Sequence, residues 1–125
     1  MTGKVVHFEL PADDVERART FYTDTFGWQL DDMPELDYIW VRTVATDDRG
    51  QAAEPGAING GMTARQDPVT GPVITIEVED IDTALAKVVA CGGRVVQERA
   101  AVGTMGFTAY IADTEGNTIG LWQNA

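Results

Sequence analysis

Hydrophobic and polar residues alternate over the first patterned segment of the chain. Residues 5–10 read Val-Val-His-Phe-Glu-Leu, so Phe8 and Leu10 share one face while His7 and Glu9 share the other. This two-residue period is typical of a strand buried on one side only. The pattern therefore predicts a strand, ended by the following proline, with an apolar face turned to the core and a polar face turned away from it.

A helical pattern follows directly. Asp13 and Asp14 offer N-cap oxygens and a favourable charge at a helix N-terminus, and Gly27 is suited to ending the helix. The residues that recur with a 3.6-residue period and form the expected buried stripe are Val15, Ala18, Phe21, Tyr22 and Thr25. The sequence thus predicts one amphipathic helix that packs against the apolar face of the strand.

Three shorter strand patterns complete the first half at residues 28–30, 37–44 and 56–63, the last of them loosened by glycines. A polar loop, residues 47–55, separates the second and third of these strands. Residues 65–72, with two prolines and a glycine, form the natural linker to the second half.

The second half repeats the first at a spacing of 66 positions. Asp80 and Gly93 stand where Asp14 and Gly27 stand in the first half. Its expected elements are a strand at 73–78 with Ile74, Ile76 and Val78 in the core, a helix capped by Asp80 or Asp82, strands at 94–96, 106–112 and 118–123, and a tight turn at 113–117. A duplication of this length indicates a module that its copy must complete.

The predicted fold class is therefore α+β, with two tandem βαβββ modules whose curved mixed sheets enclose a cleft. We expect one domain over residues 1–125, formed by a module at 4–64, the linker at 65–72 and a module at 73–124. Function is expected in the cleft between the copies, where a small ligand has room to bind.

Charge and composition exclude several classes of partner. The net charge of -11 repels nucleic-acid backbones and anionic membrane surfaces, and no apolar run approaches the roughly 18 residues that span a bilayer. One cysteine, Cys91, allows no internal disulfide, and we expect it to be a small buried residue. We expect a soluble, cytoplasmic protein that binds neither nucleic acid nor membranes.

Three phrases carry a resemblance to a known family. Residues 17–28 read Arg-Ala-Arg-Thr-Phe-Tyr-Thr-Asp-Thr-Phe-Gly-Trp, residues 77–82 read Glu-Val-Glu-Asp-Ile-Asp, and residues 113–117 read Asp-Thr-Glu-Gly-Asn. Together with His7, fifteen positions before Tyr22, they resemble the vicinal oxygen chelate superfamily of glyoxalases, bleomycin-resistance proteins and extradiol dioxygenases. The resemblance implies the tandem βαβββ fold, a homodimer, and a branch of the superfamily that is widespread in bacteria.

The same resemblance implies four metal-ligand positions, one on each of four strands. His7 occupies the first, the second falls near Asn59 or Gly60, and Val73 and Gly120 occupy the third and fourth. Valine and glycine side chains have no electron pair to donate, and a catalytic metal normally has three or more protein ligands. We therefore expect a metal-free protein with no other cofactor, in which His7 is the only remnant ligand.

His7 and Glu9 are the candidate catalytic pair. A histidine beside a carboxylate can act as a general base, because the carboxylate raises the pKa of the imidazole and fixes its tautomer. The alternative interpretation is a former ligand position whose histidine is now hydrogen-bonded in the wall of the cleft.

The candidate ligand-binding residues are those that carry aromatic or polar groups onto the predicted cleft: Trp28, Trp40, Asn59, Thr75, Tyr110 and Trp122. Flat ligands stack well on aromatic walls, although aromatic residues also favour strands for structural reasons. The leading hypothesis is binding or sequestration of a small aromatic or planar metabolite or antibiotic. One alternative is a metal-independent lyase or isomerase that uses His7 as general acid and base, and another is a metal-dependent enzyme of the glyoxalase or dioxygenase type.

Overall fold

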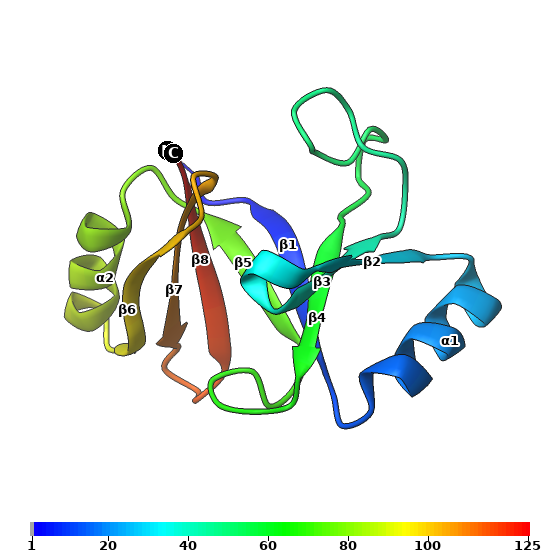
Figure 1. Ribbon diagram of the computed structural model, residues 1–125. Coiled ribbons are helices and arrows are strands. Elements are labelled where there is room, and N and C mark those ends of the chain that lie inside the picture. Colours follow the sequence, from blue (N-terminus) through cyan, green and yellow to red (C-terminus); the bar gives the residue numbers. More distant parts are fainter. Residues whose placement is uncertain (1) are drawn as a thin grey trace. The chain divides into compact units, whose positions relative to one another are not determined.

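The computed structural model describes residues 2–125, which divide into two compact units. We call residues 7–72 the N-terminal unit, and residues 73–125 together with residues 2–6 the C-terminal unit. Each unit contains one α-helix packed on one face of its strands (Figure 1). The first strand begins in the C-terminal unit, where the backbone carbonyl of Lys4 accepts a hydrogen bond from the amide of Glu77 at 2.9 Å.

The N-terminal unit follows the predicted βαβββ order. Its elements are β1 (Val5–Ala12), α1 (Val15–Phe26), β2 (Gln29–Met33), the short 3-10 helix η1 (Pro34–Leu36), β3 (Tyr38–Arg42) and β4 (Gly60–Ala64). The strands lie in the order β2-β3-β4-β1, with β1 and β4 parallel and the other pairs antiparallel. The long connection between β3 and β4 extends beyond the ends of these strands (Figure 1).

The C-terminal unit repeats this arrangement. Its elements are β5 (Val73–Glu77), α2 (Ile81–Ala90), β6 (Arg94–Val102), β7 (Gly106–Ala112) and β8 (Thr118–Asn124). The strands lie in the order β5-β8-β7-β6, with β5 and β8 parallel. β6 extends six residues beyond the predicted 94–96, because its exposed second half still pairs with β7 as far as Val102 opposite Gly106.

Both helices begin at the predicted residues. The side chain of Asp14 accepts a hydrogen bond from the amide of Arg17 at 3.0 Å, and Asp80 caps α2 in the same way through Thr83. Gly27 ends α1 in the left-handed conformation, with φ of 74°, and its amide donates to the carbonyl of Thr23. The capping residues thus confirm the repeat that the sequence indicated.

Each unit has its own apolar core between helix and sheet. The buried residues of the N-terminal core are Ala12, Leu30, Ile39, Val41 and Met62, and those of the C-terminal core are Ile81, Leu85, Ala109, Ile111 and Leu121. Phe8 and Leu10 pack against the first core, and Ile76 and Val78 against the second, as their alternation predicted. The opposite face of each sheet is left for polar side chains.

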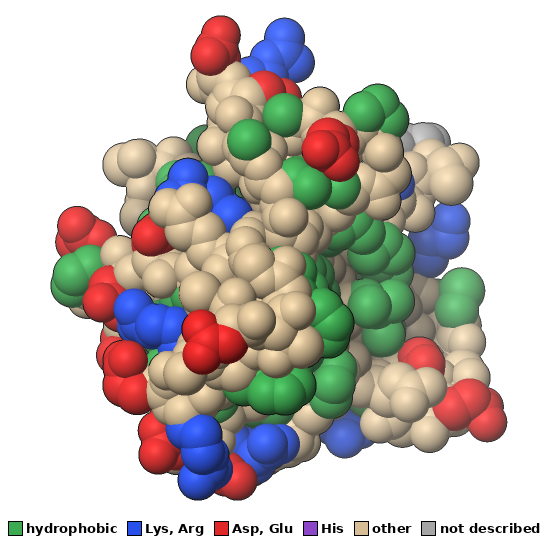
Figure 2. All heavy atoms as spheres, turned by 90° about the vertical axis from the view of Figure 1, so that its right-hand side faces the viewer, with side chains coloured by type: hydrophobic (Ala, Val, Ile, Leu, Met, Phe, Trp, Pro, Cys, Tyr) green, Lys and Arg blue, Asp and Glu red, His purple; other side chains and the backbone are tan. Residues whose placement is uncertain are grey.

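Four expectations about burial are wrong. Thr25, near the end of α1, is exposed. Ile74 is 48% exposed, whereas Ile76 on the same side of β5 packs against the core. Phe21 is 53% exposed, and its ring contacts Tyr22 and Phe26 of the same helix. Hydrophobic side chains are visible on the face of the molecule drawn in Figure 2. Cys91, at the end of α2, is also exposed.

Candidate functional site

Strand register brings a set of polar and aromatic side chains onto one face of the N-terminal sheet. Glu9 lies beside Gly61, Gly61 beside Trp40, and Trp40 beside Asp31 across the four strands. His7 shares this face because it stands two residues before Glu9, and Tyr38 and Arg42 share it because they flank Trp40 at the same spacing. We call this surface, opposite the apolar core, the polar face of the N-terminal unit.

A hydrogen-bonded chain of three side chains lies on the polar face. The hydroxyl of Tyr38 donates to Oε2 of Glu9 at 2.9 Å, and the hydroxyl oxygen of Tyr38 also lies 2.8 Å from Nε2 of His7. The rings of His7 and Tyr38 are nearly parallel, at an interplanar angle of 19°. Glu9 is only 7% exposed, so its carboxylate is held inside the protein and hydrogen-bonded there.

Gly61 is the residue that makes room for this chain. A Cβ atom at position 61 would lie 1.7 Å from the hydroxyl oxygen of Tyr38 and 1.9 Å from its Cζ. No side chain is compatible with those distances. The phenol of Tyr38 therefore occupies the space that any larger residue at position 61 would need.

Burial sets the protonation of His7. Desolvation lowers the pKa of this imidazole below its usual value, and the nearby charge of Glu9 offsets that effect only in part. His7 is therefore neutral at pH 7, with one protonated ring nitrogen and one acceptor nitrogen.

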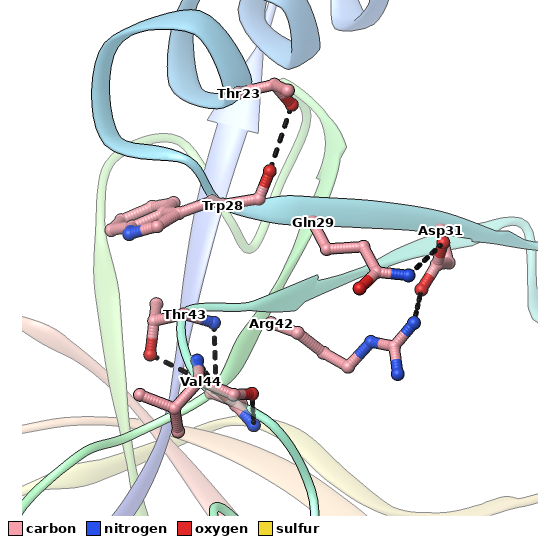
Figure 3. Close-up of polar contacts among 8 residues, drawn as sticks. Thr23, Trp28, Gln29, Asp31, Arg42, Thr43 and Val44 are labelled. Atoms are coloured by element: carbon pink, nitrogen blue, oxygen red, sulfur yellow. Dashed lines mark hydrogen bonds and ion pairs between the residues drawn. The ribbon is translucent and has the colours of Figure 1, made fainter.

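A second group on the polar face surrounds Trp40. The guanidinium of Arg42 lies 5.0 Å from the centroid of the Trp40 ring, within the range of a cation–π contact. Arg42 also forms an ion pair with Asp31, which in turn accepts a hydrogen bond from the side chain of Gln29 (Figure 3). This pairing holds the guanidinium in place and leaves its charge balanced.

The side chain of Asn59 is hydrogen-bonded to the chain just after β3. Its Oδ1 accepts hydrogen bonds from the amides of Thr43 and Val44 at 2.8 and 3.1 Å and from the hydroxyl of Thr43, and its Nδ2 donates to the carbonyl of Val44. Figure 3 shows these bonds where the chain leaves β3. The amide thus fixes the start of the β3–β4 connection, and Asn59 is 8% exposed.

Trp28 lies on the helix side of the sheet. Its indole stacks on Tyr22 with centroids 4.9 Å apart and planes 6° apart, and it also contacts Phe8 and Phe26. In Figure 3 its ring points away from Arg42 and Asp31. The structure therefore separates Trp28 from Trp40, although the sequence suggested both for the same role.

The C-terminal unit has a corresponding face. Thr75 and Gly120 lie side by side on β5 and β8, Tyr110 of β7 lies next to Gly120, and all three are buried. Trp122 is on the same face, where its Nε1 donates to Oδ1 of Asn124 at 2.8 Å. Thr75, Tyr110 and Trp122 thus share one face of this unit.

The side chains at the family's metal positions do not fit a metal ion. No three His, Cys, Asp or Glu side chains among residues 2–125 are grouped to hold one. A Cβ at Gly120 would come within 2.7 Å of Oγ1 of Thr75, and the aliphatic side chain of Val73 is 2% exposed. Nε2 of His7, the one imidazole left at these positions, lies within hydrogen-bond distance of the Tyr38 hydroxyl.

A hollow of the N-terminal unit lies elsewhere. It has a volume of about 450 Å³ and is lined by Val15, Glu16, Arg19, Asp32, Met33, Pro34, Asp37, Tyr38, Ile39, Met62, Thr63 and Ala64. His7, Glu9 and Trp40 do not line it. The hollow and the hydrogen-bonded chain share only Tyr38.

Sequence reasoning did not assign Tyr38 a role. Its position two residues before Trp40 places it on the polar face, and that spacing was the available signal. Its contact with His7 depends on the antiparallel register of β3 and β4 and on the glycine at position 61, which the sequence alone does not reveal.

The fold is that of the glyoxalase and bleomycin-resistance proteins, and comparisons with known proteins agree. Residues 4–43 match the family described as bleomycin resistance protein-like N-terminal. A glyoxylase-like domain-containing protein of Didymella fabae is 31% identical over 121 residues, covering 93% of this chain and 90% of that protein. The chain therefore belongs to the glyoxalase-like proteins of the vicinal oxygen chelate superfamily.

A longer relative is the Mycobacterium tuberculosis protein CFP32, whose name describes it as a glyoxylase. It is 32% identical over 115 residues, and the match covers 92% of this chain. The chain spans only 43% of the length of that relative.

Solved structures share the fold at low sequence identity. A glyoxalase/bleomycin resistance protein/dioxygenase superfamily member from Vibrio splendidus has a TM-score of 0.63 at 15% identity, covering 99% of this chain and 100% of that one. A methylmalonyl-CoA epimerase in complex with methylmalonyl-CoA has a TM-score of 0.67 at 17% identity, covering 100% and 96%. Within residues 2–125, neither helix is long and apolar enough to cross a membrane.

Proposed function

We propose that this protein binds a small planar molecule on the polar face of its N-terminal unit, without a bound metal ion. The observation that carries the proposal is the pair formed by Trp40 and Arg42 beside the chain of His7, Tyr38 and Glu9. An indole held by a stacked guanidinium offers a flat contact surface, and the neighbouring polar chain offers hydrogen bonds that orient a ligand.

The charges on the polar face favour a neutral or cationic ligand. Arg42 is paired with Asp31, and Glu9 places a carboxylate that is only 7% exposed on this face. An anionic ligand would meet this carboxylate and a chain whose net charge is -11.

The test is a titration with a panel of planar aromatic and heteroaromatic compounds, followed by tryptophan fluorescence and calorimetry. Trp40→Leu should weaken a saturable ligand roughly tenfold, because a stacked aromatic pair contributes about 0.5–1.5 kcal/mol beyond its buried area. Trp28→Phe is the matched control, since that indole lies against Tyr22 on the helix side. Chelator treatment should leave the affinity unchanged. A panel with no saturable ligand, or equal weakening by both substitutions, would refute the proposal.

A second candidate function is proton transfer by His7 without a metal, as in a lyase or isomerase. The neutral imidazole tied through Tyr38 to Glu9 favours it. The epimerase with the same fold suggests the assay, which is deuterium exchange at the carbon beside the carbonyl of a compound such as methylmalonyl-CoA. If the protein is such an enzyme, His7→Ala should lower the rate of deuterium exchange on the order of a hundredfold or more. A protein that only binds ligands should catalyse no exchange in the wild type.

The metal-dependent alternative has its own test. Elemental analysis that finds about one transition metal ion per purified chain, together with exchange that a chelator abolishes, would favour it over both proposals above.

We also propose a homodimer in the cytoplasm of a bacterium. The exposed aromatic rings of Phe21 and Phe26 on α1, at 53% and 61%, support an association through this helix. Light scattering should then give twice the 13.5 kDa mass of one chain, and a monomer at micromolar concentration would contradict the proposal.

A further inference from the structure

We propose that Glu9 and Tyr38 fix the tautomer of His7, so that its Nδ1 atom accepts a hydrogen bond and the ligand must present an N–H or O–H group to it. This inference rests on the proposed binding function and adds a chemical requirement for the ligand. It makes Tyr38 a positioning residue, which acts on the ligand through His7.

The direction of the hydrogen bonds follows from the number of protons. A carboxylate only accepts, so the phenolic proton of Tyr38 is used in the 2.9 Å bond to Glu9. The Tyr38 oxygen has no second proton, and the 2.8 Å contact with Nε2 of His7 therefore requires that the imidazole donates. His7 is held in the form that carries its proton on Nε2.

The other ring nitrogen is then an acceptor. With its proton on Nε2, the neutral ring keeps a lone pair on Nδ1. Among the described residues no hydrogen bond to Nδ1 is formed, and the buried unpaired polar atoms are Nε of Arg19 and Nε of Arg42 only. Nδ1 is thus accessible to a ligand or to water.

The hydrogen bonds of Tyr38 to Glu9 and His7 depend on the glycine at position 61. The phenol lies directly over its Cα, in space that any side chain at position 61 would fill. Strand pairing holds Gly61 beside Glu9 on one side and beside Trp40 on the other. The backbone therefore fixes where the hydroxyl of Tyr38 can lie, and through it the tautomer of His7.

Nitrogen-15 NMR of the apo protein tests the tautomer, and the measurement is unambiguous because His7 is the only histidine. The wild type should show a protonated Nε2 and an unprotonated Nδ1. In Glu9→Met the phenol loses its carboxylate acceptor and should donate to Nε2, so the proton should move to Nδ1 and the two nitrogen signals should exchange roles. A wild-type proton on Nδ1, or no change in Glu9→Met, would overturn the inference.

Tyr38→Phe provides a second, nearly isosteric variant in case Glu9→Met fails to fold. The proton on Nε2 should exchange with water at least about tenfold faster once its acceptor is removed. Tyr22→Phe is the matched control, because that ring packs on Trp28 and does not contact His7. An unchanged exchange rate in Tyr38→Phe would contradict the role of the hydroxyl.

The ligand requirement is tested with indole and 1-methylindole, which differ in one N–H donor. The wild type should bind indole about tenfold more tightly, and Glu9→Met should lose that preference, because Nδ1 then carries the proton. Equal affinity of the wild type for both probes would refute the requirement. If neither probe binds while NMR shows the predicted tautomer, the proposed binding function fails and the ligand requirement fails with it, but the fixed tautomer stands.

Discussion

Replacing Gly61 by alanine tests the central feature of the polar face, because the new Cβ would lie 1.7 Å from the Tyr38 oxygen and 2.2 Å from its Cε2. The phenol must leave its place, which removes its bonds to Glu9 and His7. A hydrogen bond to a charged group contributes about 1.5–3 kcal/mol and a neutral one about 0.5–1.5 kcal/mol. The free energy of unfolding should therefore fall by about 2–4 kcal/mol.

Urea denaturation followed by circular dichroism measures this change. With a typical slope of about 1–3 kcal/mol per molar urea, the midpoint should fall by on the order of 1–2 M. Gly71→Ala is the matched control. A Cβ there has no atom within 4 Å and the backbone is not left-handed, so its stability should stay the same or rise slightly.

A double-mutant cycle separates the contact with Tyr38 from a general effect on β4. In a Tyr38→Ala background the phenol is gone, and Gly61→Ala should cost less than about 1 kcal/mol. The reasoning is refuted if Gly61→Ala is as stable as the wild type, or if it is equally destabilising with and without the Tyr38 ring.

Three further predictions concern single groups. Burial lowers the pKa of His7 in the folded protein below the unfolded value of 6.5, so the unfolded state binds more protons just below that pH. The free energy of unfolding should therefore be highest above pH 6.5 and fall as the pH decreases toward the folded pKa. Urea titrations at a series of pH values should show a weaker pH dependence in His7→Gln. Asn59→Ala removes the buried amide that holds Thr43 and Val44, and should cost about 1–3 kcal/mol by the same assay, whereas a neutral result would contradict its structural role. Asp14→Ala removes the N-cap of α1 and should cost about 0.5–2 kcal/mol in thermal unfolding, with Asp14→Asn close to wild type, since asparagine caps equally well.

The repeat and the elements could be read from the sequence because their signals are local. Asp14, Asp80 and Gly27 act within a few residues of their own positions, and the alternation of His7 and Glu9 with Phe8 and Leu10 decides which face each side chain takes. Such short-range preferences determine the order βαβββ and the polar face of β1. The absence of donor atoms on Val73 and Gly120 is likewise a property of residue type alone.

Tertiary structure decided which of these residues meet. Trp28 and Trp40 looked equivalent in the sequence, yet the turn after α1 places one against Tyr22 and the pairing of β3 with β4 places the other beside Gly61. Tyr38 is far from His7 in the chain, and only the strand register and the missing side chain at position 61 bring their polar atoms together. Contacts between distant strands depend on register and packing, which no local pattern encodes.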